Sequence, residues 1–215
     1  DVKKGGIMTF NPKSDKIAIT IPKFTLKQNA DKGLFMSKYN EPYILSMAID
    51  SQGKANPQID FNFMPFPKIC AKQTVEMLGD GHLLYGPKNP GEFVALSILI
   101  MESDADIRKA GEFAEKAVKS EAVKLGLKAL IATNPGASAI LGILKEVIQF
   151  VAGRLKNNGD DELFRYEGSF LRNLPNPYHI NRRYTGSNDF VEVAVQIIPL
   201  DFLFSPELAN TAVKL

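Results

Sequence analysis

The hydrophobic pattern of this chain changes period at an acidic corner, residues 102–106, which holds Glu102, Asp104 and Asp106. Before the corner, the apolar run at residues 93–101 is typical of a strand. After it, apolar residues recur at the spacing of one helix face. Three carboxylates at such a junction indicate either the N-terminus of a helix or one wall of a cation site.

The segments on both sides of the helical part predict strands. Ile17, Ile19 and Ile21 alternate with polar or small residues, and residues 58–64 alternate in the same way. Gly79 and Gly81 flank one aspartate and predict a tight turn. The other predicted strands are residues 42–50, 82–85, 92–101, 162–170 and 189–200.

The helical part covers about residues 104–158 and predicts two helices. In the first helix, Val123 and Leu127 fall off the main apolar stripe, and together with Gly126 they indicate a break or a second buried contact near its end. The second helix, residues 137–156, is apolar over about half its circumference. We therefore expect a mainly β protein: an antiparallel β-sandwich with a two-helix insertion between strands, forming one domain over residues 1–215.

Composition removes several functional classes. The formal charge of +2, from 26 basic and 24 acidic residues, gives no field that would attract nucleic acid. The single Cys70 and two histidines fit no zinc spacing. No phosphate-binding loop, dinucleotide fingerprint or nucleophile elbow occurs, so we do not expect an enzyme. The chain begins without Met and without a signal-peptide pattern, which indicates trimming or processing and leaves the compartment open.

The acidic corner has two interpretations. Ser103 or Asp104 can cap the following helix, and Asp106 can interact with its positive dipole end. Alternatively, the carboxylates bind a hard cation such as calcium, which takes six to eight oxygen ligands, usually from more than one loop. Possible second contributors are the loop that holds Asp31, the pair at residues 40–41, and the pair at residues 160–161.

A family resemblance bears on this choice. Residues 23–26 (Lys-Phe-Thr-Leu), a polar loop with Asp31, and residues 40–45 (Asn-Glu-Pro-Tyr-Ile-Leu) resemble the first half of a C2 domain. Residues 99–106 resemble the C2 strand and loop that end in spaced aspartates. The resemblance implies an eight-stranded antiparallel sandwich whose loops bind calcium and then phospholipid. It implies as metal ligands Asp31, Glu102, Asp104 and Asp106.

Two further segments are candidates for binding. Residues 107–156 carry nine basic and four acidic side chains, a local charge of +5. A basic helical pair with a broad apolar face can lie on an anionic membrane surface, or it can pack that face on the sandwich. The loop at residues 176–184 holds two Tyr and two Arg, which can recognise phosphate or carbohydrate, or fix the loop to its neighbours.

Together these patterns predict a non-enzymatic binding or interaction module. Its specific form is calcium-dependent binding of lipid or protein, with calcium as the candidate cofactor. The alternatives are a structural or assembly subunit of a larger particle, and a membrane-active protein that uses the basic helical pair. The expected partners are a protein, an anionic membrane surface or a second copy of the chain.

Overall fold

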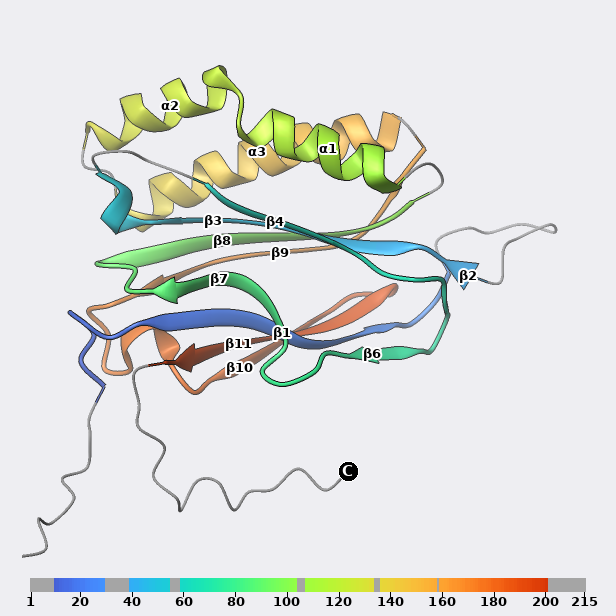
Figure 1. The fold of residues 1–215 in the computed structure, drawn as a ribbon, viewed down its shortest axis with the longest axis horizontal. Coiled ribbons are helices and arrows are strands. Elements are labelled where there is room, and N and C mark those ends of the chain that lie inside the picture. The colour runs from blue at the N-terminus through green and yellow to red at the C-terminus, as the bar shows by residue number, and fades with distance from the viewer. Residues whose placement is uncertain are drawn as a thin grey trace, which may run out of the picture.

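The computed structural model describes residues 10–29, 39–54, 59–103, 107–133, 136–157 and 159–200. These residues form three layers. Two antiparallel sheets pack face to face, and a layer of helices covers the outer face of one of them (Figure 1). The predicted sandwich and its helical insertion are therefore confirmed at this level.

The sheet next to the helices has four strands within the described residues, in the order β4-β3-β8-β9, all antiparallel. Its members are β3 (Pro42–Asp50), β4 (Asp60–Pro65), β8 (Phe93–Glu102) and β9 (Asp161–Leu171). Every residue of the two central strands, β3 and β8, is buried. Such strands contact a packed layer on each face, which explains the continuous apolar run that leads to the acidic corner.

The second sheet is built around β1 (Ile17–Leu26). One side of β1 pairs with β11, and the other pairs with β7 through its first half and β6 through its second half. The register of β1 against β11 shifts between Thr20 and Lys23, where the partner on the opposite side also changes. The remaining strands of this sheet are β6 (Thr74–Glu76), β7 (His82–Lys88), β10 (Arg183–Ser187) and β11 (Val191–Pro199).

Short elements complete the fold. A two-stranded ladder joins β2 (Tyr39–Asn40) to β5 (Ile69–Cys70), and two 3-10 turns are η1 (Ser51–Lys54) and η2 (Pro177–His179). The sequence did not predict β2, β5, β6 or β10, because strands of two to five residues are too short to show a period.

The four-stranded sheet divides two hydrophobic cores. Ile44 and Ile98 face the other sheet, where they join the core around β1. Their neighbours Leu45 and Leu99 face the helices. Because side chains alternate along a strand, one strand supplies both cores.

The prediction of two helices was wrong. Between β8 and β9 the described residues form three: α1 (Ile107–Val118), α2 (Glu121–Ile131) and α3 (Ala137–Asn157). The predicted first helix divides at Ser120, whose hydroxyl accepts a hydrogen bond from the N–H of Val123 at 3.4 Å, as an N-cap does. Val123 and Leu127, which did not fit the first stripe, therefore belong to a separate helix with its own inner side.

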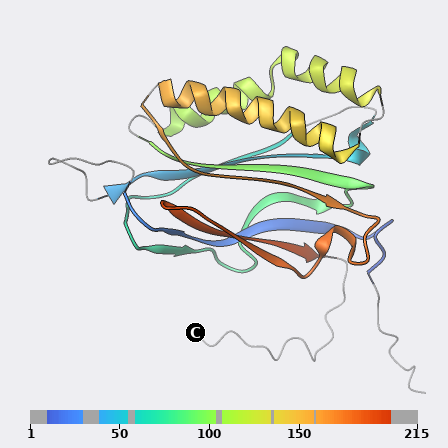
Figure 2. The ribbon, with the colours of Figure 1, turned by 180° about the vertical axis from the view of Figure 1, so that it is seen from behind.

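The three helices are not equally buried. Helices α1 and α3 lie on the four-stranded sheet, and α2 lies farther from that sheet than α3 (Figures 1 and 2). The ion pairs Lys145–Glu167 (3.0 Å) and Lys156–Glu162 (2.8 Å) join α3 to β9. In the described part of the chain, no helix is both long enough and apolar enough to span a membrane.

The predicted turn at Gly79 and Gly81 is confirmed. Gly81 of this turn packs closely against β1 of the second sheet. Both glycines have positive φ, +60° and +99°. A Cβ on Gly81 would lie 2.4 Å from the carbonyl oxygen of Ile21, whereas a Cβ on Gly79 would have no heavy atom within 4 Å. The turn is held on the sheet by its Asp80 carbonyl, which accepts hydrogen bonds from Thr20 and Gln196.

Gly81→Ala should lower the free energy of unfolding by about 3 kcal/mol, because it combines backbone strain with a clash against backbone. Gly79→Ala is the matched control, with strain alone and an expected loss of about 1 kcal/mol. Urea unfolding measures both. Equal losses would show that the turn does not rest on β1 as described.

Candidate functional site

The acidic corner lies where β8 leaves the sheet. Glu102 and Ser103 are 4% and 6% exposed. The Glu102 carboxylate accepts a hydrogen bond from the N–H of Glu41 at 3.4 Å, and the N–H of Ser103 donates to the carbonyl of Glu41 at 3.1 Å. Of the four predicted ligands, Asp31, Asp104 and Asp106 lie outside the described residues, so only Glu102 has a described position.

The return of the insertion brings a further carboxylate to this corner. Asp160, 3% exposed, precedes β9 and accepts hydrogen bonds from the Tyr43 hydroxyl at 2.6 Å and from the Ser103 hydroxyl at 3.5 Å. The residues on the two sides of the insertion, Ser103 and Asp160, are therefore in contact with each other, and Tyr43 of β3 holds Asp160. The sequence had indicated residues 160–161 as possible contributors, and the structure brings Asp160 into contact with the corner.

Burial and negative charge fix the protonation of Tyr43. Burial raises the pKa of its hydroxyl, and the hydrogen bond to Asp160 and the charges of Asp160 and Glu102 raise it further. The hydroxyl thus stays a hydrogen-bond donor at every physiological pH. Carboxylate oxygens such as those of Glu102 and Asp160 are a ligand type that calcium prefers. Within the described ranges, however, no three His, Cys, Asp or Glu side chains are grouped as metal ligands.

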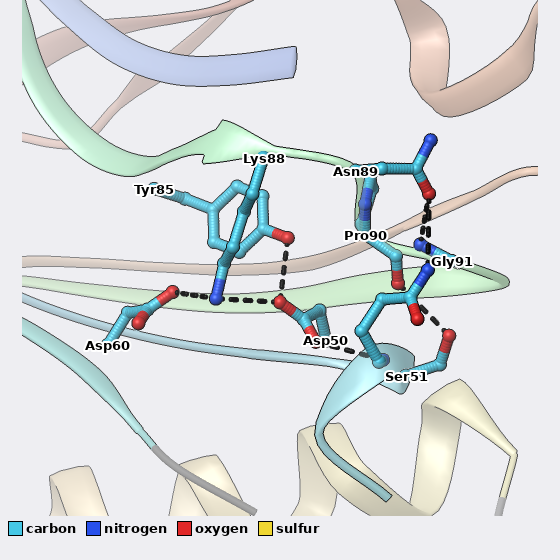
Figure 3. Close-up of polar contacts among 9 residues, drawn as sticks. Asp50, Ser51, Asp60, Tyr85, Lys88, Asn89, Pro90 and Gly91 are labelled. Atoms are coloured by element: carbon cyan, nitrogen blue, oxygen red, sulfur yellow. Dashed lines mark hydrogen bonds and ion pairs between the residues drawn. The ribbon is translucent and has the colours of Figure 1, made fainter. Parts of the chain in front are cut away.

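A second polar cluster joins the two sheets (Figure 3). Lys88 and Tyr85 reach from β7 toward Asp50 of β3 and Asp60 of β4. The Lys88 ammonium makes ion pairs of 2.8 Å with both aspartates, and the Tyr85 hydroxyl donates to Asp50 at 2.8 Å. The N–H of Gln52 donates to the other oxygen of Asp50 at 2.9 Å. A buried carboxylate thus receives three partners from two segments, β7 and η1.

The charges of this cluster support one another. Burial alone would lower the pKa of Lys88, but the hydrogen bonds and charges of Asp50 and Asp60 outweigh burial and raise it. Burial and the adjacent Asp50 raise the pKa of Tyr85. Lys88 therefore stays cationic and Tyr85 neutral. Sequence reasoning missed this cluster because no short-range motif links Asp50, Asp60 and Lys88.

The loop at residues 176–184 packs against neighbouring segments. Tyr178 is fully buried, with its hydroxyl within hydrogen-bonding distance of the carbonyl oxygens of Pro12 and Gly91. His179 and Tyr184 share a hydrogen bond and lie beside Phe170. The contacts of Tyr178 fix the loop to neighbouring segments, while Tyr184 is half-buried and Arg182 and Arg183 are exposed.

The helical layer carries the positive charge of the protein. Residues 107–156 have a formal charge of +5, whereas the whole chain has +2, so the remaining residues total −3. On α2, Leu125 is 64% exposed, and Ala122 and Ala129 are exposed on the same side of the helix. Lys124 and Lys128 lie along one edge of this side and are also exposed. We call Ala122, Lys124, Leu125, Lys128 and Ala129 the outer face of α2.

No protein-family model, curated protein or solved structure matches this chain. The resemblance to C2 domains therefore stays a prediction, and the function has to be argued from the chain's own residues.

Tyr43→Phe should lower the free energy of unfolding by about 1–3 kcal/mol, because it removes a close donor from a buried carboxylate. Tyr166→Phe on β9, a half-buried tyrosine, is the matched control and should cost less than about 0.5 kcal/mol. Denaturant unfolding of both variants gives the comparison. Equal small losses would mean that the contacts around Asp160 do not depend on the Tyr43 hydroxyl.

Proposed function

We propose that this protein is a non-enzymatic binding module that attaches to an anionic lipid surface through the outer face of α2. The observation that carries the proposal is the exposure of Leu125 beside Lys124 and Lys128 on the helix that lies farthest from the sheet. An exposed apolar side chain flanked by lysines is typical of a helix side that lies on an anionic membrane.

The distribution of charge supports an orientation for this contact. Lys145 and Lys156 are paired with carboxylates of β9, so they hold α3 in place. Among the described residues, no carboxylate lies within ion-pair distance of Lys116 or Lys128, and Lys124 pairs only with Glu121 of its own exposed first turn. These lysines are accessible to an anionic surface, while the rest of the chain, at −3, is repelled by it.

The expected energies are modest and mostly electrostatic. Each lysine near an anionic leaflet contributes about 1 kcal/mol. Burying a leucine side chain adds roughly 1.5–3 kcal/mol when it goes from fully exposed to fully buried, and Leu125 is already partly covered. Binding should therefore be weak for one molecule, dependent on anionic lipid and reduced by salt.

Co-sedimentation with vesicles tests the proposal. The protein should bind vesicles that contain phosphatidylserine and not vesicles of phosphatidylcholine alone. Lys124→Gln combined with Lys128→Gln should weaken binding by about 2 kcal/mol, or roughly 30-fold, and Leu125→Ser by about tenfold.

Lys13→Gln combined with Lys72→Gln is the charge-matched control, since both lysines are exposed and lie outside the helical layer. Its binding should equal that of the unaltered protein. Equal loss in the control and the α2 variant would remove α2 from the contact, and no binding to either vesicle would remove the function.

A second candidate function is calcium binding at the acidic corner. The observation that favours it is the burial of Glu102 and Asp160 at the two ends of the insertion, beside the segment that holds Asp104 and Asp106. Glu102, with Asp31, Asp104 and Asp106, would supply carboxylate ligands from separate loops, as calcium sites require. The bound ion would reduce the negative charge at the start of the helical layer and so favour approach to anionic lipid.

Calorimetric titration with calcium tests this second candidate. Calcium at 1 mM should raise the free energy of unfolding by about 2.7 kcal/mol if its dissociation constant is near 10 µM. Asp106→Asn should abolish the heat, and Glu112→Gln, an exposed change on α1, should leave it unchanged. No heat and no rise in melting temperature at millimolar calcium would exclude the cation.

A further inference from the structure

A cleft opens where the edges of the two sheets approach each other. β4 belongs to one sheet and β7 to the other, and the side-chain amide of Asn62 bridges them by donating to the carbonyl of Leu84 at 3.1 Å. The C-terminal half of α1 overhangs this edge and contributes Glu115, and Lys119 follows directly after the helix. The cavity volume is about 370 Å³, within the range of sites that hold small ligands.

The lining of the cleft combines apolar surface with charge. Phe61 and Leu83 supply apolar contact, and Leu83 remains 37% exposed, whereas Tyr85 lies buried behind them. The Tyr85 hydroxyl is turned to Asp50, so its ring is held in a fixed position (Figure 3). The apolar surface that a ligand can cover is therefore the exposed part of Leu83 together with the half-buried Phe61.

Lys88 is a preorganised cation at this surface. Its ammonium contacts Asp50 and Asp60 and lies 5.0 Å from the centre of the Tyr85 ring. Because Asp50 is buried, Lys88 cannot turn away without leaving that carboxylate short of a partner. An ammonium has three donors, and two are directed to the aspartates, so one remains for a ligand.

Across the cleft, Lys119 and Glu115 form an exposed pair at the C-terminal end of α1, at 2.5 Å. Pairs of this kind are weak, so both side chains can exchange partners readily. The cleft is thus lined by two ammonium groups, Lys88 and Lys119, and by two carboxylates, Asp60 and Glu115.

We propose that this cleft binds a free amino acid with an apolar side chain. The ligand's carboxylate lies between Lys88 and Lys119, its ammonium group meets Asp60 and Glu115, and its side chain covers Leu83 and Phe61. A simple anion is repelled by the two carboxylates and a simple cation by the two lysines, so the balanced lining selects a zwitterion. The site is separate from the outer face of α2 and does not depend on lipid binding.

Phenylalanine is a suitable probe, with phenylacetate and phenethylamine as analogues that each lack one charge. In NMR titrations of the whole chain, phenylalanine should cause saturable shifts of the Leu83 methyl groups and of the Lys88 and Lys119 amides, with a dissociation constant near or below about 1 mM. The two analogues should bind at least tenfold more weakly. No saturable shift by about 10 mM, or equal binding of all three, would overturn the proposal.

Glu115→Gln and Lys119→Gln test the recognition of both charges, and both residues are exposed at the end of α1, where substitution does not disturb the core. Each variant should weaken phenylalanine binding at least fivefold, and Lys109→Gln on the same helix should not. Binding that is unchanged in both variants would also overturn the proposal. Lys88→Met is a less direct test, because it removes the partner of Asp50, and it is therefore not needed for the decision.

Discussion

Burial of β3 and β8 on both faces is the constraint on which the rest of the structure depends. One face of these strands packs against the sheet around β1, and the other presents Tyr43, Leu45, Met47, Leu99 and Met101 to the helices. Without the helical layer, this second face would be an apolar patch larger than a soluble monomer tolerates. The insertion is therefore part of the core, and α2 lies on the side of the helical layer away from the sheet (Figure 2).

This arrangement explains why polar groups are buried at the ends of the insertion. The chain leaves the sheet at Glu102 and returns at Asp160. Its backbone and carboxylate groups are therefore buried between the sheet and the helical layer at these two points. Tyr43 and Ser103 supply hydrogen bonds to Asp160 there. The second cluster, around Lys88, does the same for Asp50 where the two sheets meet. Both networks give a buried carboxylate its hydrogen-bond partners, and a ligand that binds there would add to these contacts.

Much of the fold could be predicted because local patterns carry it. Alternation at Ile17, Ile19 and Ile21 predicted β1, and the period change at residues 102–106 predicted the start of the insertion. The predicted number of helices was wrong because the apolar spacing is helical on both sides of Ser120. Only the cap at Ser120 and the change of the buried side show that α1 and α2 are separate helices.

The candidate sites were harder to predict, for a physical reason. Asp50, Asp60 and Lys88 come together only through strand pairing and sheet packing, which no spacing in the sequence records. The approach of Asp160 to the acidic corner could be anticipated because the two ends of an insertion must return to adjacent strands. Exposure of Leu125 follows from the position of α2 above α3 and could not be distinguished from burial by periodicity alone.

Native-state hydrogen exchange of the whole chain tests most directly whether the insertion belongs to the core. The structure predicts that amides of β3, β8 and α3 exchange only through global unfolding, while amides of α2 exchange at least about a hundredfold faster through local opening. Exchange of α3 as fast as that of α2, with β8 still protected, would contradict the account, because the helical layer would then not be needed to cover the sheet.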